Sequence, residues 1–319
     1  MSAPMPAAAA QLRPAFDGVR LAAEVAELRA STWKRQQSYD VDALPPTTED
    51  WRCLALRSPG GDGTRTDPGG PGTEEFADTE WLDRAPLIRE ILRSVPAPLR
   101  AVRLMALGPG ARSIDHFDTK YGPAWGVARL HVPVTTNPDA VLVLGGVTYR
   151  WQPGSFWFGD FSREHRVENN GETTRIHLVI DCLVVPGLAT LFPAGWQSYF
   201  TDGEVLYGRP TVPVQRLDDH LYRFPVPKAF ADWEQDDVFA PGTPTETAVV
   251  IRTPGGLELQ TSEGARFALV HLGDGEFRFA GWSEERTVRL PAGATEATLR
   301  TRRGRTIDEY RVPAERADR

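Results

Sequence analysis

The feature that most constrains the fold of this chain is a series of short apolar runs between Ala101 and Val185, separated by turn residues. The runs are rich in valine, leucine, tryptophan and phenylalanine, and they read AVRLMAL, VARLHVPVTT, AVLVLGGVTYRW, GSFWFGD and TRIHLVIDCLVV. Closely spaced runs of this length are typical of antiparallel strands in a barrel or sandwich. The sequence therefore predicts a mainly β core over residues 101–185.

Two amphipathic helices are predicted before this core. Apolar residues recur at helical spacing from Phe16 to about Trp33, and Asp17 can cap the first turn. A shorter helix is predicted from Pro86 to Ser94, since proline suits the first helical turn. The stretch 58–73 between them is dense in glycine and proline and lacks a following GK[ST]. It is interpreted as a surface loop, with a lid over a nearby site as the alternative.

A second β-rich region is predicted toward the C-terminus. AVVIRT, LELQT, RFALVHL and EFRFAGW read as strands, and Asp274-Gly275 is a hairpin signal. We therefore divide the chain into a domain over 1–185, a Pro-rich connecting segment over 186–245 and a small β-rich domain over 246–319. In that last domain an arginine cluster is predicted to be a solvated hairpin, with recognition of an acidic peptide as the alternative. Its members are Arg300, Arg302, Arg303 and Arg305.

Composition excludes several classes of protein. A net charge of -7 argues against nucleic acid or an anionic membrane as the main partner. Cys53 and Cys182 stand far apart, which excludes a disulfide framework and a thiolate zinc site and fits a reducing compartment. The first residues lack a signal-peptide pattern, and the uncharged run 182–201 contains prolines and glycines that suit a spanning helix poorly. We expect a cytoplasmic protein.

The histidines are concentrated in the β core. None of the six precedes residue 116, and four fall between His116 and His177. In SIDHFDTK, the expected first strand of the barrel, His116 and Asp118 are two residues apart and share one face. His165, in FSREHRVENNG, is the best candidate for a third ligand. Two histidines and one carboxylate form a facial triad that suits Fe(II) and leaves positions open for a substrate acid and O₂. The alternative is a chance H-x-D pair that binds no metal.

Basic residues in the same core predict an anion-binding pocket. Arg175 lies in the apolar run TRIHLVID, where a buried guanidinium is costly unless a carboxylate pairs with it. A bound dicarboxylic acid would satisfy it through a bidentate pair. Arg129 and His131 again share a face and favour a second carboxylate, the alternative being two satisfied polar residues at a barrel mouth. Tyr121 and Trp125, in the loop TKYGPAWGVA, are candidates for substrate contact.

The order of these motifs resembles the aspartyl/asparaginyl β-hydroxylase family. The motifs are HxD, RLHVPV, a glycine-bounded GSFWF, HRVENNG and R-x-H-L-V-x-D, and the resemblance covers roughly residues 16–185. Members of that family are Fe(II)- and 2-oxoglutarate-dependent oxygenases on a double-stranded β-helix, a cupin-like jelly roll. The resemblance implies that the Fe(II) ligands are His116, Asp118 and His165. It also implies that Arg175 binds the distal carboxylate of 2-oxoglutarate, with Arg129 and His131 near its metal-bound end.

The resemblance implies a function but leaves the substrate open. Animal members of the family lack the carboxylate ligand, whereas this chain retains Asp118 and is more similar to the bacterial branch. We expect a dioxygenase that uses O₂ and converts 2-oxoglutarate to succinate while it hydroxylates an amino acid. That amino acid is free, carrier-tethered or peptide-bound, possibly at an Asp/Asn β-carbon. The alternatives are a non-catalytic cupin-like binding or sensing protein, and a protein whose C-terminal domain binds a partner as its main function.

Overall fold

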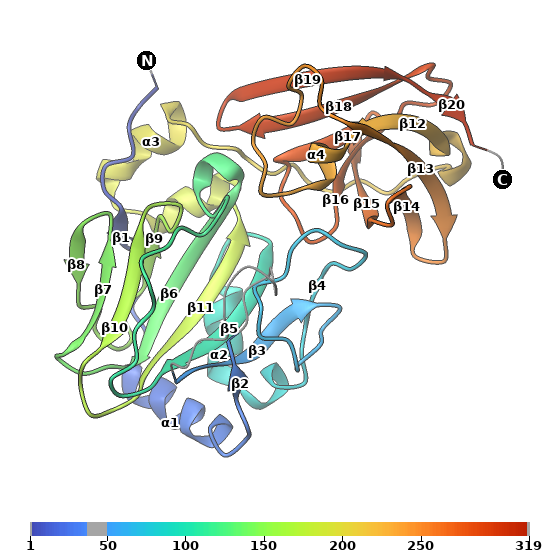
Figure 1. Ribbon diagram of the computed structural model, residues 1–319. Coiled ribbons are helices and arrows are strands. Elements are labelled where there is room, and N and C mark those ends of the chain that lie inside the picture. The colour runs from blue at the N-terminus through green and yellow to red at the C-terminus, as the bar shows by residue number, and fades with distance from the viewer. Residues whose placement is uncertain (1, 37–49, 318–319) are drawn as a thin grey trace. The chain divides into compact units, whose positions relative to one another are not determined.

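The computed structural model describes residues 2–36 and 50–317 of the 319-residue chain. It is mainly β, as predicted, and it divides into two compact units (Figure 1). Unit 1 comprises Met1–Gly69, Phe76–Pro123 and Val127–Val205. Unit 2 comprises Leu206–Arg319 together with two short segments from earlier in the chain, Gly70–Glu75 and Ala124–Gly126.

Unit 1 contains an eight-stranded and a three-stranded antiparallel sheet. The larger sheet has the order β1-β9-β6-β11-β5-β3-β2, with β4 paired to β3. Its strands are β1 (Ala9–Gln11), β2 (Lys34–Arg35), β3 (Trp51–Pro59), β4 (Phe76–Asp78), β5 (Leu99–Leu107), β6 (Val127–Thr135), β9 (Trp157–Gly159) and β11 (Arg175–Leu183). The smaller sheet, β10-β7-β8, consists of β7 (Ala140–Leu144), β8 (Val147–Tyr149) and β10 (His165–Asn169).

The two sheets of unit 1 share one apolar core. Leu107 at the end of β5 packs in the same buried cluster as Leu142 of β7 and Val167 of β10. Burying one face of each sheet against the other removes apolar surface from water and fixes the register of the strands. The result is the predicted cupin-like jelly-roll core, which brings β6 and β11 of one sheet close to β10 of the other.

The predicted helices flank this core. In α1 (Gly18–Leu28) the Asp17 carboxylate accepts hydrogen bonds from the Val19 and Arg20 backbone N–H groups, at 3.1 and 3.0 Å, which confirms the predicted cap. The second helix is α2 (Pro86–Arg93), and α3 (Gln197–Asp202) follows the core. Unit 1 also contains the 3₁₀ helices η1 (Leu82–Arg84), η3 (Pro186–Leu191) and η4 (Ala194–Trp196). Among the described residues no helix combines the length and apolar character that crossing a bilayer requires.

Unit 2 is an antiparallel meander that closes on itself. Its sheet order is β19-β18-β17-β16-β15-β14-β13-β12-β20, and β20 follows β19 after one residue, so β20 joins the last long strand to β12. Phe224, Phe277 and Phe279 are among the buried residues that fill its interior. The strands are β12 (Tyr222–Pro227), β13 (Thr245–Thr253), β14 (Gly256–Thr261), β15 (Arg266–Gly273), β16 (Glu276–Phe279), β17 (Arg286–Arg289), β18 (Glu296–Arg303), β19 (Thr306–Pro313) and β20 (Glu315–Arg316). Also present are α4 (Lys228–Ala231), η2 (Pro123–Trp125) between β5 and β6, and η5 (Leu217–His220).

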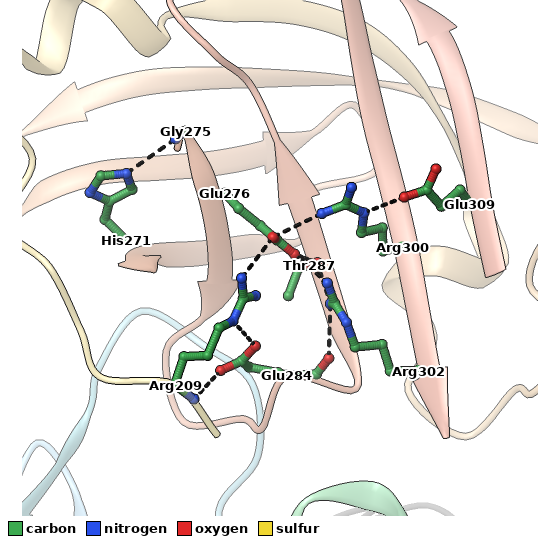
Figure 2. A network of polar contacts seen from close by, with 9 residues as sticks. All are labelled: Arg209, His271, Gly275, Glu276, Glu284, Thr287, Arg300, Arg302 and Glu309. Carbon is green, nitrogen blue, oxygen red and sulfur yellow. Dashed lines mark hydrogen bonds and ion pairs between the residues drawn. The ribbon is translucent and has the colours of Figure 1, made fainter. Parts of the chain in front are cut away.

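The arginine cluster does lie on a hairpin, formed by β18 and β19, but the hairpin is not simply solvated. Figure 2 shows the reason: Glu276 of β16 accepts hydrogen bonds from Arg209 (3.0 Å), Arg300 (2.8 Å), Arg302 (2.5 Å) and the Thr287 hydroxyl (2.6 Å). Arg302 is buried as a result. Burial alone raises the pKa of Glu276, but these donors outweigh it and hold the pKa far below its usual range. Arg300 and Arg302 are therefore occupied by a protein carboxylate, and the prediction of a solvated cluster is wrong for both.

Candidate metal centre

The structure brings His116, Asp118 and His165 together. One ligand atom from each lies within 4.8 Å of the others. The Nε2 atoms of His116 and His165 lie 3.8 and 4.0 Å from the same Asp118 carboxylate oxygen. A single β-bridge places the two histidines side by side, because each backbone N–H donates to the other's carbonyl, at 3.0 and 2.9 Å. The segment 116–118 and the strand β10, which are distant in sequence, thus bring three candidate ligands together.

SIDHFDTK is not the regular strand that the sequence predicts. Within it only His116 makes an isolated bridge, and Lys120 turns the chain with a φ of 59°. Ile114 and Phe117 remain mostly exposed, at 64 and 61 % of their surface, so no second sheet covers the other face. The convergence of His116 with Asp118 is nevertheless preserved, because the Asp118 N–H donates to the Phe161 carbonyl at 2.9 Å.

Both imidazoles are oriented to present Nε2. The Nδ1 atom of His116 lies 2.9 Å from the Ile114 carbonyl, and that of His165 lies 2.9 Å from the Arg163 carbonyl. Because a carbonyl only accepts, each Nδ1 carries a hydrogen, which leaves Nε2 as the nitrogen that can bind a metal. Burial lowers the pKa of His165 despite the nearby Asp118, so its ring is neutral at neutral pH. Two imidazole nitrogens and one carboxylate oxygen fit a divalent metal.

Arg129 holds the second oxygen of Asp118. Its Nη1 donates to Asp118, while Nε and Nη2 donate to Asp181 at 2.7 and 3.0 Å. Burial raises the pKa of Asp118, but the charge of Arg129 together with the nearby histidines and Arg103 outweighs it, and the pKa of the carboxyl lies below its usual range. Asp118 is therefore ionised at neutral pH, with one oxygen on Arg129 and the other toward the imidazoles. Asp181 is the last residue of the motif R-x-H-L-V-x-D, but the sequence pattern does not predict that it pairs with Arg129.

Arg103 is a site residue that the sequence reasoning missed. It lies on β5 opposite Val179 of β11, and Val179 in turn lies opposite His131 of β6, so Arg103 and His131 share one face of the sheet. Its Nη2 lies 3.8 Å from the Asp181 carboxylate. The sequence contains a signal that could have identified Arg103: it is a charged residue within the apolar run LRAVRLMAL, just as Arg175 is in TRIHLVID.

Arg175 is buried without a carboxylate partner in the described chain. Its Nη2 donates to Nδ1 of His177 at 3.0 Å, and that His177 nitrogen lies 3.3 Å from Nδ1 of His131. Burial lowers the pKa of Arg175 to about 10. The rings of Trp151 and Phe161 pack on His131, with centroids at 5.3 and 5.0 Å. Arg129, His131 and Arg175 thus lie on one face of the larger sheet, as predicted. His177 belongs to the same group of buried, hydrogen-bonded side chains.

The two predicted substrate residues, Tyr121 and Trp125, belong to different units. Tyr121 lies under Arg129, with 4.2 Å between the guanidinium carbon and the ring centroid, and its buried hydroxyl has no hydrogen-bond partner within the described structure. Trp125 belongs to unit 2, where the guanidinium of Arg303 lies 4.6 Å from its ring. Only Tyr121 contacts the Asp118–Arg129 pair.

Comparison with known proteins assigns the part of the chain that contains these residues to a family. The aspartyl/asparaginyl beta-hydroxylase family matches residues 19–184, about half of the chain. A 2OG-Fe(II) oxygenase family oxidoreductase from Burkholderia pseudomallei is 11% identical, over 54% of this chain and 82% of its own, with a TM-score of 0.36. The non-heme alpha ketoglutarate dependent epimerase SnoN from nogalamycin biosynthesis is 10% identical, over 55% and 78%, with a TM-score of 0.37. The comparison with curated proteins gave no match. The extent of the family match shows that this chain is a member of the aspartyl/asparaginyl beta-hydroxylase family, whose enzymes are 2-oxoglutarate- and Fe(II)-dependent hydroxylases.

Proposed function

We propose that this protein is an Fe(II)- and 2-oxoglutarate-dependent hydroxylase of an amino acid that is free, carrier-tethered or within a peptide. The observation that carries the proposal is one juxtaposition on the jelly roll. Three ligand atoms, from His116, Asp118 and His165, lie within 4.8 Å of one another, and a buried Arg175 has no carboxylate partner in the described chain. The first feature suits Fe(II), and the second suits a dicarboxylic co-substrate.

His116, Asp118 and His165 would hold the metal through Nε2, a carboxylate oxygen and Nε2. When bound, Fe(II) and 2-oxoglutarate supply the oxidising chemistry: O₂ and 2-oxoglutarate are consumed, succinate and CO₂ are released, and a substrate C–H bond becomes C–OH. The protein's part is to orient these three groups. The carbonyls of Ile114 and Arg163 orient the histidines, and Arg129 orients Asp118 and favours its ionised form.

Arg175 would bind the distal carboxylate of 2-oxoglutarate. A guanidinium forms two parallel hydrogen bonds to a carboxylate, and burial excludes the water that would compete for them. His131 would lie near the metal-bound end of the same co-substrate. Arg129 already donates to Asp118 and to Asp181, so we assign it the orientation of Asp118 in addition to its predicted place beside 2-oxoglutarate.

Two further donors favour a substrate that carries an oxygen-rich group. The Tyr121 hydroxyl and the Nε of Arg103 are buried and have no hydrogen-bond partner among the described residues. A buried donor left without an acceptor is costly, so a ligand oxygen at this place would be stabilised. The carboxylate of an amino acid carries the negative charge and the acceptor oxygens that such donors stabilise.

The test is turnover of 2-oxoglutarate by the purified protein with Fe(II) and a panel of free amino acids and short peptides. We expect succinate to form at a rate that at least one member of the panel raises, and His116→Ala or Asp118→Ala to abolish both succinate formation and metal binding. His271→Ala, which changes a histidine of unit 2, serves as the matched control and should retain turnover. Binding of metal and 2-oxoglutarate without succinate would instead identify a non-catalytic cupin-like binding protein, and binding of neither would overturn both.

A further inference from the structure

Asp181 is a fully buried carboxylate to which the proposed function gives no part. It lies on β11 directly opposite Arg129 of β6, and it is 0% exposed. Its Oδ1 accepts a hydrogen bond from Nε of Arg129 at 2.7 Å, and its Oδ2 accepts one from Nη2 at 3.0 Å. Two parallel hydrogen bonds of this kind are a strong and geometrically specific pairing of a guanidinium with a carboxylate. Asp181 therefore occupies one complete edge of the Arg129 guanidinium.

The pairing with Asp181 fixes the direction of the remaining donors of Arg129. A guanidinium is planar, and its five N–H groups keep fixed angles to one another. Tyr121 packs against this plane, with 4.2 Å between the guanidinium carbon and the ring centroid. With Nε and Nη2 on Asp181, Nη1 donates to Oδ2 of Asp118. Oδ1 of Asp118 then faces the two histidine ligands, 3.8 and 4.0 Å from their Nε2 atoms.

Arg129 is shared between two carboxylates. Among the described residues, Asp118 and Asp181 are the acidic side chains that form ion pairs with it. Burial lowers the pKa of Arg129, but these two carboxylates outweigh burial and raise the pKa above its usual range, so the arginine stays charged. Without Asp181, Asp118 would be left as the acidic partner of Arg129. The guanidinium would then favour a bidentate pair that takes both oxygens of Asp118.

We infer that Asp181 is a positioning residue for the metal ligand Asp118. By occupying the Nε–Nη2 edge of Arg129, it limits Arg129 to one oxygen of Asp118 and leaves the other oxygen for the metal. The inference rests on the proposed function, since it takes His116, Asp118 and His165 to be the metal ligands. All of these residues belong to unit 1.

The test is Mn(II) binding by the full-length protein without 2-oxoglutarate, measured from the electron paramagnetic resonance signal of free Mn(II). Asp181→Asn keeps the size of the side chain but removes its charge and one acceptor oxygen. Arg129 should then take both oxygens of Asp118, and we expect the Kd for Mn(II) to rise roughly 10- to 100-fold. Asp181→Asn/Arg129→Gln also removes the guanidinium, so Asp118 is released and the Kd should return to within about threefold of wild type.

Two comparisons separate positioning from charge and from loss of structure. Asp181→Glu keeps the charge but displaces the carboxylate, so it should raise the Kd as well, whereas a role through charge alone would leave the Kd unchanged. This variant also decides the question if urea denaturation shows that Asp181→Asn is not folded. Asp78→Asn and Asp78→Asn/Arg57→Gln change the same residue types in another ion pair of unit 1 and are the matched controls, which should keep the wild-type Kd.

The outcomes that contradict the inference differ from one that contradicts the proposed function. A wild-type Kd in both Asp181→Asn and Asp181→Glu would overturn the positioning role. A double variant that binds Mn(II) as weakly as Asp181→Asn would overturn it too, because removal of Arg129 would then not release Asp118. Wild-type protein that binds no Mn(II) would overturn the metal centre itself, and the inference with it.

Discussion

Arg286 of unit 2 and Arg175 of unit 1 are both buried guanidinium groups on β-strands, yet their surroundings differ. Arg286 is 0% exposed, forms an ion pair with Glu285 at 3.3 Å and donates to four backbone carbonyls. Those carbonyls belong to Ala229, Phe230, Asp232 and Gln235, at 2.5–2.8 Å. Arg175 is 6% exposed and has one imidazole nitrogen as its acceptor. One arginine is satisfied by its own protein, and the other is not.

We propose that this difference distinguishes an arginine that stabilises the fold, Arg286, from one that binds a ligand, Arg175. Burying a charge costs several kcal/mol, and the cost is offset only where acceptors surround the group. The carbonyl acceptors around Arg286 belong to α4 and to the residues that follow it, so the arginine holds this part of the chain against the meander. Comparable acceptors are not seen around Arg175 in the described chain, and a bound carboxylate would supply them. Removing the two side chains should therefore have opposite consequences.

The largest effect is expected for Arg286→Met. This variant removes the guanidinium that donates to four carbonyls and pairs with Glu285, so we expect the free energy of unfolding to fall by about 3–5 kcal/mol. Urea denaturation of the full chain measures it. Arg311→Met, at an exposed position, is the control. A loss for Arg286→Met no larger than that of the control would show that the carbonyls are satisfied in another way.

Arg175→Met should leave the fold intact and weaken the binding of 2-oxoglutarate. Loss of a buried ion pair with a ligand costs about 2–3 kcal/mol, which corresponds to a rise of roughly 30- to 150-fold in the Kd for 2-oxoglutarate. Titration of the Mn(II)-loaded protein measures the Kd, and urea denaturation should show stability equal to wild type or higher. Arg20→Met is the matched control, because Arg20 is an exposed arginine of α1 in the same unit. An unchanged Kd for Arg175→Met would remove Arg175 from the site.

The smallest expected effect is a dependence of stability on pH. Burial and the charge of Arg175 lower the pKa of His131 and His177 well below 6.5 in the folded protein. The unfolded chain therefore binds more protons as the pH falls below about 6.5, and stability that is present above this pH is lost below it. Each histidine contributes at most ~1.4 kcal/mol per pH unit.

Urea denaturation at pH 7.5, 6.5 and 5.5 measures this slope for the metal-free protein. His131→Asn/His177→Asn should flatten it. Arg175→Met should flatten it in part, because the charge that helps to keep both rings neutral is gone. A slope that persists unchanged in the double variant would assign the dependence to other groups.

Much of the fold could be predicted because the signals are local. Asp17 caps α1 through its own neighbours, and the apolar runs of the core alternate on one chain segment at a time. The grouping of the three candidate ligands could be predicted for the same reason, since His116 and Asp118 lie two residues apart and His165 lies in an extended segment. Residue type and spacing carried this information without any knowledge of the register between strands.

The rest depends on contacts distant in sequence. Arg302 is buried because Glu276, on another strand, accepts from it, and Arg129 is oriented by Asp181 through the pairing of β6 with β11. Trp125 is a candidate for substrate contact because it lies in the loop between the first two expected strands, yet its backbone carbonyl contacts Ser283 and its ring contacts Arg303. No local pattern indicates which strands of a remote meander will hold a given loop.

The order of these residues along the chain has a consequence for biosynthesis. The segments 70–75 and 124–126 leave the ribosome well before Ala268, Ser283 and Gly304, the residues that bind them. At ~5–20 residues per second the second segment waits roughly ten to thirty seconds for Ser283. A nascent chain of 200 residues would already contain His116, Asp118, His165 and Arg175 but none of the hydrogen-bond donors that hold those segments. The contacts of both segments within unit 2 are thus complete only in chains whose synthesis has passed the β18–β19 hairpin.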